Sequence, residues 1–119
     1  TFNLWNNNES MMYRKGNDTN FGRIIGKPGQ SIAFKQGQLY RDDRQVKESY
    51  TDTRIDELSL RNVKGSEGDI IPPDVYFVLN DNRNNKHDSR TIGFVRQEEI
   101  IGDISLRYYL FDRFTANFN

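Results

Sequence analysis

The sequence contains no cysteine and a single histidine. Without cysteine, neither a disulfide framework nor thiol chemistry is possible. One histidine with no cysteine also argues against a structural zinc site. The 17 basic residues balance the 17 acidic residues, so the formal charge is zero, and no basic excess indicates a nucleic-acid partner. We therefore expect no metal, no cofactor and no nucleic-acid binding.

Long hydrophobic runs are also absent. The longest, residues 75–79 and 108–111, fall far short of the ~20 apolar residues that cross a bilayer. No segment resembles the hydrophobic region of a secretory signal peptide. Because the sequence starts at Thr1 without methionine, we expect residues 1–119 to be one soluble domain of a longer protein, with a segment removed upstream. A chain of this length supports a single core.

The residue pattern of the first half favours strands over helices. Residues 21–25 are β-rich and end at the turn-forming cluster 26–29. Residues 31–35 alternate polar and apolar side chains, and Gln36-Gly37 reverses them into residues 38–40, which is typical of a hairpin. The pattern predicts an all-β fold of twisted antiparallel sheets, with long loops and at most short helical turns.

The second half continues this organisation. Residues 76–79 read as a buried strand, and the polar run 80–90 reads as a long structured loop rich in Asn and Asp. Residues 96–100 suit one helical turn, and residues 102–111 a final strand. The stretch 47–68 is polar and poorly patterned, so no element type is assigned to it.

Two blocks of the sequence carry a family signature. Residues 80–83 read Asn-Asp-Asn-Arg, residues 88–90 read Asp-Ser-Arg, and Gly93 follows. This spacing closely resembles the C-terminal signature of type I signal peptidases, Gly-Asp-Asn-Arg leading to Ser-x-Asp-Ser-Arg-x-x-Gly. Residues 23–29 resemble the family's Lys-Arg-Val-Ile-Gly-x-Pro-Gly-Asp without its leading lysine. The resemblance extends over nearly the whole chain and is closest to the short Gram-positive members.

The resemblance implies a serine nucleophile and a lysine general base, and the chain departs from both. The base position is Gly22, and the block with the nucleophile is expected upstream of Thr1, so Ser10 and Ser31 are not at its position. A glycine cannot take a proton from a serine. We therefore expect an inactive homologue, with no catalytic residue in this chain.

Two further positions differ from the family signature. Asn80 stands where the family has glycine, and Lys86 where it has a serine beside the base. Lys86 is either a displaced base in an active peptidase or a solvated lysine on a polar loop. The spacing of the sequence identifies neither a second histidine nor a carboxylate and serine that would act together with His87. We therefore expect His87 to be exposed.

The other motif residues are expected to support the loop. In the family, a carboxylate–arginine pair orders the active-site loop, and here Asp88 and Arg90 would pair with each other or with neighbouring strands. Asp81 and Asn82 are interpreted as turn formers, and Ser89 as a hydrogen-bonding partner of the loop backbone. The remaining motif residues of the loop are Arg83 and Gly93.

Asn20 and Phe21 come directly before the lost lysine. In the family, that strand pairs with the extended backbone of the substrate, so the resemblance implies a peptide-binding edge here. Phe21 would either line or fill a side-chain pocket, or pack in the core. The expected partners are signal-peptide-like segments or an active signal peptidase. The expected location is the extracytoplasmic face of the cell membrane, reached through an upstream anchor. A small β-barrel of another class, binding a ligand, is the remaining alternative.

Overall fold

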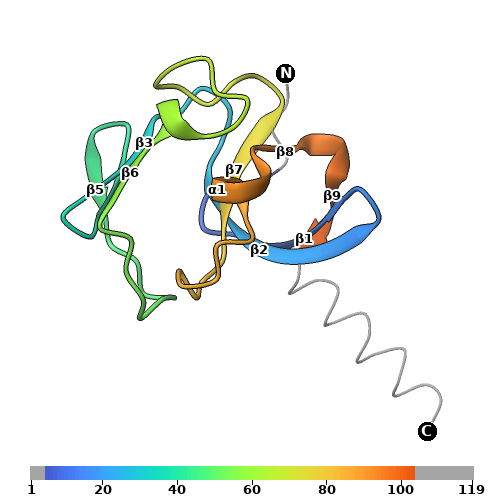
Figure 1. Ribbon diagram of the computed structural model, residues 1–119, viewed down its shortest axis with the longest axis horizontal. Coiled ribbons are helices and arrows are strands. Elements are labelled where there is room, and N and C mark those ends of the chain that lie inside the picture. The colour runs from blue at the N-terminus through green and yellow to red at the C-terminus, as the bar shows by residue number, and fades with distance from the viewer. Residues whose placement is uncertain (1–4, 104–119) are drawn as a thin grey trace, which may run out of the picture.

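The computed structural model describes residues 5–103, which form two antiparallel sheets and three short helical turns (Figure 1). The strands are β1 (Ser10–Lys15), β2 (Asp18–Gly26), β3 (Ile32–Lys35), β4 (Gln38–Arg41), β5 (Arg44–Val46), β6 (Glu57–Ser59), β7 (Val75–Leu79), β8 (Val95–Arg96) and β9 (Ile100–Asp103). The helical turns are η1 (Leu60–Asn62), α1 (Ser89–Ile92) and η2 (Gln97–Glu99). Within this part of the chain, no helix is long and apolar enough to cross a membrane.

The larger sheet has the strand order β8-β7-β2-β1-β9, and the smaller sheet has the order β5-β4-β3-β6. The strand β7 lies between β8 and β2, and both of its faces are buried. Tyr76 and Val78 point to one face, and Phe77 and Leu79 to the other, as the two-residue period of a strand requires. Two separate apolar clusters therefore meet along β7.

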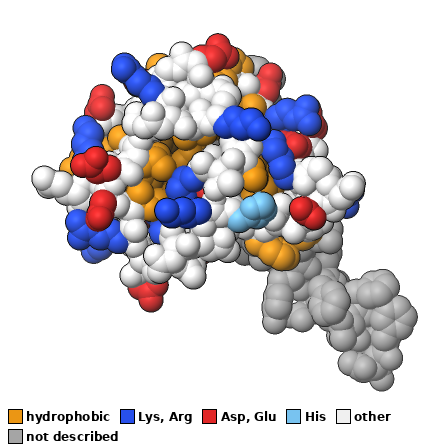
Figure 2. Space-filling view, in the orientation of Figure 1, with side chains coloured by type: hydrophobic (Ala, Val, Ile, Leu, Met, Phe, Trp, Pro, Cys, Tyr) orange, Lys and Arg blue, Asp and Glu red, His pale blue; other side chains and the backbone are white. Residues whose placement is uncertain are grey.

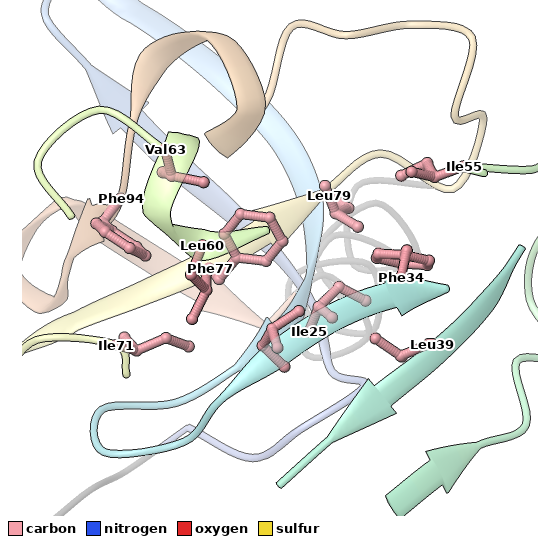
Figure 3. Packing of buried hydrophobic residues seen from close by; sticks show 11 residues of the cluster. Ile25, Phe34, Leu39, Ile55, Leu60, Val63, Ile71, Phe77, Leu79 and Phe94 are labelled. Carbon is pink, nitrogen blue, oxygen red and sulfur yellow. The ribbon is translucent and has the colours of Figure 1, made fainter. Parts of the chain in front are cut away.

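The first cluster joins the two sheets. Phe34 and Leu39 from the smaller sheet meet Ile25 of β2 and Phe77 and Leu79 of β7 (Figure 3). Its remaining buried members are Ile32, Ile55, Leu60, Val63, Ile71 and Phe94. Phe77 and Phe94 pack edge to face, with ring centroids 6.3 Å apart. This cluster fixes the smaller sheet against the larger one.

The second cluster lies on the opposite face of the larger sheet. Met11, Tyr13, Ile24, Tyr76, Val78 and Val95 are its buried members. The turn α1 packs against β7, and its Ser89 side chain accepts a hydrogen bond from the Val78 amide (2.9 Å).

The predicted all-β class is confirmed, with two antiparallel sheets and only short helical turns. The strand predicted at residues 21–25 lies within β2, and the hairpin at Gln36-Gly37 joins β3 to β4. The helical turn expected at residues 96–100 is η2. The unassigned stretch 47–68 contains β6 and η1. Of the predicted final strand, residues 102 and 103 lie in β9 and the remainder falls outside the described residues.

Candidate functional site

Gly22 lies in β2 on the face of the second cluster, two residues before Ile24 of that cluster. A Cβ atom added at Gly22 would lie 2.4 Å from Val78 Cγ1, 3.3 Å from Tyr13 Cε1 and 3.6 Å from the Leu79 carbonyl oxygen. The first distance is far below van der Waals contact, and a valine γ-carbon is not the flexible end of a long side chain. The position is therefore closed by β7 and β1, and a side chain there requires its neighbours to move.

Tyr13 lies beside Gly22 and brings a phenol hydroxyl into the second cluster. The side chain is fully buried, and its hydroxyl has no hydrogen-bond partner among the described residues. Burial, together with the negative charge of Asp88, raises the pKa of Tyr13 to about 12. At neutral pH the phenol therefore holds its proton. The side-chain amide nitrogen of Asn20, paired across the strands with Tyr13, is also buried without a partner.

Asp88 and Arg90 form the pair expected from the sequence. Their ion pair is 2.8 Å long, and the Asp88 side chain is fully buried. The Asp88 carboxylate also accepts hydrogen bonds from the backbone amides of Asn80 (2.9 Å) and Arg90 (3.0 Å). Arg90 donates further to the carbonyl oxygens of Arg83 and Asn85, both at 2.9 Å. The pair therefore connects the start of α1 to residues 80, 83 and 85 of the loop between β7 and α1.

Gly93 ends α1 with φ at +84°. A Cβ atom there would lie 2.9 Å from the Lys64 carbonyl oxygen. Both the left-handed conformation and this close backbone approach favour glycine. Gly93 is thus a structural residue of the loop.

Asp81 and Arg83 each pair with a residue from another part of the chain. Arg23 donates two hydrogen bonds to the Asp81 carboxylate, both 2.8 Å long. Arg83 is buried and donates to Glu48, with the shorter bond at 2.6 Å. Asp81 is thus an ion-pair partner and not only a turn former. Asn82 has the expected turn role, since its side chain accepts from the Asn84 amide (3.1 Å).

Glu48 and Tyr50 belong to this charged network and were not identified from the sequence. The Tyr50 hydroxyl donates to Glu48 (2.8 Å), and the Arg23 guanidinium lies 4.2 Å from the centre of the Tyr50 ring. Burial and the neighbouring Glu48 raise the pKa of Tyr50. Both residues lie in the poorly patterned stretch 47–68.

Lys86 is exposed and does not lie among the nearest neighbours of the Gly22 position. It lines a cleft together with β6 residues and with Arg83, Asn84 and Arg90. His87 is exposed, as expected. Within residues 5–103, no group of three or more acidic, histidine or cysteine side chains is arranged to hold a metal ion.

Asn20 and Phe21 lie where β2 has a neighbour on one side only. β1 pairs with β2 over residues 18–23, whereas β7 pairs with it only from Arg23 onward. The Phe21 side chain is 60% exposed, so the core-packing interpretation of this residue is wrong. The result is a short open sheet edge beside Gly22.

A model of the family described as "Signal peptidase, peptidase S26" matches residues 13–109. Proteins named "Inactive signal peptidase IA" from Staphylococcus aureus, for example strain COL, are 56% identical over 119 residues, covering 99% of this chain and 68% of theirs. "Signal peptidase IB" from S. aureus strain N315 is 28% identical over 94% of this chain and 64% of its own length.

A solved structure has the same fold. The crystal structure of a signal peptidase I from Enterococcus faecalis V583 aligns with a TM-score of 0.76, over 87% of this chain and 99% of that chain. Its sequence identity to this chain is 22%, so this similarity concerns the fold alone.

We expect Asp88→Ala and Arg90→Ala each to lower the free energy of unfolding by about 3 kcal/mol, because each leaves the other charge buried and unpaired. Urea unfolding followed by circular dichroism measures the change. The matched control is Arg54→Ala, which removes an ion pair whose side chains are more than half exposed. Unfolding midpoints of both loop variants equal to that of Arg54→Ala would contradict the structural role of the pair.

A second prediction concerns the closed position at Gly22. Gly22→Ala should destabilise the domain by about 1–3 kcal/mol, because its new methyl group meets Val78 in a packed cluster. The double variant Gly22→Ala/Val78→Ala should be more stable than the sum of the single effects predicts, since the second change removes the clash. The four proteins of this cycle are compared by urea unfolding, and strictly additive effects would show that the two positions do not compete for space.

Proposed function

We propose that this chain, which belongs to the signal peptidase family (peptidase S26), is a member that does not cleave signal peptides. One observation carries the proposal. Gly22, which the motif resemblance places at the family's lysine base, has no side chain, and the space of its Cβ atom is occupied by Val78. The site thus lacks both the base and the room for one.

The groups that remain nearby do not replace the base. A serine becomes a nucleophile only when a neighbouring group takes its proton, and that group needs a pKa near the working pH. Of the three residues nearest to the Gly22 position, only Tyr13 has a titratable side chain, and its pKa is raised to about 12. At neutral pH a phenol of this kind donates a hydrogen bond and does not accept a proton.

Lys86 does not favour the alternative of a displaced base. Its side chain is exposed, and it lines a cleft whose other residues come from β6, η1, α1 and the surrounding loops. None of the three residues nearest to the Gly22 position lines that cleft. The relatives named inactive signal peptidase IA, at 56% identity, support the same conclusion.

The open edge of β2 supports a retained peptide-binding role. Ile24 exchanges its backbone hydrogen bonds with Asn8 and Glu9, on the β1 side. Because these groups alternate in direction along a strand, the amides and carbonyls of Thr19 and Phe21 point to the open side. An extended peptide would pair there by strand addition. We assign this role to the segment Asn20–Phe21, with a signal-peptide-like segment as its ligand.

The family indicates where in the cell the proposed peptide binding would take place. Signal peptidases of this family are membrane-associated, with the catalytic domain outside the cytoplasm. We place this chain at the extracytoplasmic face of the cell membrane, anchored by an upstream segment. An active signal peptidase is the second partner that this setting offers, because both proteins would meet the same secretory precursors there.

The full-length protein is expected not to cleave a synthetic peptide that spans a signal-peptide cleavage site. The rate should be at least about 100-fold below that of an active type I signal peptidase, because the general base is missing. Mass spectrometry of the products measures cleavage. Gly22→Lys by itself should not restore it, since the lysine Cβ atom meets Val78 at 2.4 Å.

One outcome would establish the displaced base instead. Cleavage by the unmodified protein that is abolished by Lys86→Ala and retained in Lys64→Ala would assign the base to Lys86. Lys64 is the matched control because it is also an exposed lysine in a loop.

Peptide binding at β2 is tested by two changes at one residue. Phe21→Ala and Phe21→Pro both remove the exposed ring, but only proline removes the amide that points to the open edge. We expect a signal-peptide segment to shift the NMR amide signals of residues 19–21, and Phe21→Pro to abolish binding that Phe21→Ala retains in part. Equal binding by the two variants would show that the backbone of β2 is not used.

A further inference from the structure

Net charge does not distinguish one peptide from another on this protein. The 17 basic residues balance the 17 acidic ones. Figure 2 shows Lys, Arg, Asp and Glu side chains interspersed over the visible face, with apolar side chains in a hollow between them. A ligand is then selected by hydrogen-bonding groups that have no partner in the free protein, because such groups gain a bond only from a ligand that fits them.

Two groups of this kind lie together on β1 and β2. Among residues 5–103, the buried side-chain atoms without a hydrogen-bond partner are Asn7 Oδ1, Tyr13 Oη and Asn20 Nδ2. Tyr13 and Asn20 are directly opposite each other in the two strands. Side chains of directly opposite residues lie on the same face of a sheet, with Cβ atoms about 5 Å apart. The phenol and the amide are therefore neighbours beside the apolar side chains of the second cluster.

The Tyr13 ring reaches from β1 across β2 at Gly22. Its Cε1 atom lies 3.3 Å from the position of a Gly22 Cβ atom, although the residue opposite Tyr13 is Asn20. Burial and then the negative charge of Asp88 raise the pKa of Tyr13. The phenol is therefore protonated at neutral pH, and the charge of Asp88 disfavours a further anion beside it.

A peptide strand beside β2 would bring one side chain to this face, next to Asn20. Thr19 and Phe21 direct their backbone groups to the open side, so the residue of an antiparallel peptide opposite Asn20 forms a non-hydrogen-bonded pair with it. Pairs of this kind have the shorter Cα distance, about 4.5 Å, and their side chains are in contact. The Asn20 side chain is half-buried, so its amide is the polar group that this residue of the peptide meets.

The ligand group that fits this face is a small neutral hydroxyl. A hydroxyl both donates and accepts, so it can pair with either atom of the Asn20 amide and with the Tyr13 phenol. An alanine methyl group leaves the amide and the phenol unpaired. A carboxylate would place a negative charge in the region where Asp88 already acts on Tyr13.

We propose that Asn20, together with Tyr13, selects extended segments that carry serine or threonine opposite Asn20. This inference rests on the proposed peptide binding at the β2 edge and names the side chain that the edge prefers. Asn20 contacts the ligand from β2, and Tyr13 contributes the second hydrogen-bonding group from β1. The backbone of Thr19 and Phe21 holds the segment whatever its sequence, and the two polar side chains distinguish one segment from another.

The test uses the 119-residue chain labelled with nitrogen-15 and three capped peptides, Lys-Val-Leu-X-Leu-Val-Lys, in which X is serine, alanine or aspartate. NMR titration follows the backbone amides of residues 19–21 and the side-chain amide of Asn20. We expect the serine peptide to bind about 2- to 10-fold more tightly than the alanine peptide, the gain from one net hydrogen bond, and to shift the Asn20 side-chain signal. The aspartate peptide should bind no more tightly than the alanine peptide.

Two variants assign this preference to its residues. Asn20→Leu should bind the serine and alanine peptides equally, and Tyr13→Phe should reduce the serine preference. Both variants should fold, because each removes a polar group that has no partner in the free protein, and an unchanged spectrum outside β1 and β2 verifies this. Asn62→Leu is the matched control: it makes the same replacement at an exposed asparagine of η1 and should keep the preference.

The outcomes separate this inference from the proposed function. Equal binding of the three peptides that Phe21→Pro abolishes would overturn selection by Asn20 and leave peptide binding at β2 in place. No binding of any peptide would overturn both. A serine preference that persists in Asn20→Leu, or that is lost in Asn62→Leu, would show that other groups select the ligand and would also overturn the inference.

Discussion

The Asp88 carboxylate lies in the protein interior and accepts four hydrogen bonds, three of them from Arg90 and one from the Asn80 amide. A buried charge is tolerated only when it is paired and fully hydrogen-bonded. Asp88 therefore fixes the distance between the end of β7 and the start of α1. By fixing this distance, Asp88 also places the Ser89 side chain at the Val78 amide. It likewise holds the loop residues that line the cleft beside β6.

The same loop is attached to the rest of the molecule by two further ion pairs. Arg23 reaches Asp81 from β2, and Glu48 reaches Arg83 from the segment after β5. The Arg83–Glu48 pair is almost completely buried and lies beside the first apolar cluster, with the guanidinium 5.7 Å from the centre of the Phe34 ring. Polar pairing thus supplements apolar packing in holding the two sheets together. This suits a chain in which only 34% of residues are apolar.

Loss of catalysis and retention of the fold are compatible in this protein because they use different residues. The scaffold requires Asp88, Arg90 and Gly93, whose contacts are with backbone groups and with each other. Catalysis would require a side chain at Gly22, which the packing of Val78 and Tyr13 excludes. Binding at the β2 edge would use backbone groups, which need no particular side chain at the former base position. A peptide-binding role is therefore physically independent of the missing chemistry.

Much of the fold was predictable because its signals are local. The alternation in residues 31–35 and the turn at Gln36-Gly37 predicted the hairpin, and the apolar run at 76–79 predicted β7. The family resemblance, and not a local pattern, led us to expect the Asp88–Arg90 pair, which lies at the start of α1. The stretch 47–68 gave no such signal, because β6 and η1 are each only three residues long.

The candidate site required the tertiary structure, because its contacts join segments far apart in the sequence. The sequence alone determined that residue 22 has no side chain to act as a base. Only the packing of β1 and β7 against β2 decided that the space is closed by Tyr13 and Val78. Likewise, the sequence showed a lysine at position 86, but the approach of the loop to β6 placed it in a cleft. Local pattern determines which groups a strand or loop carries, and long-range packing determines which groups meet.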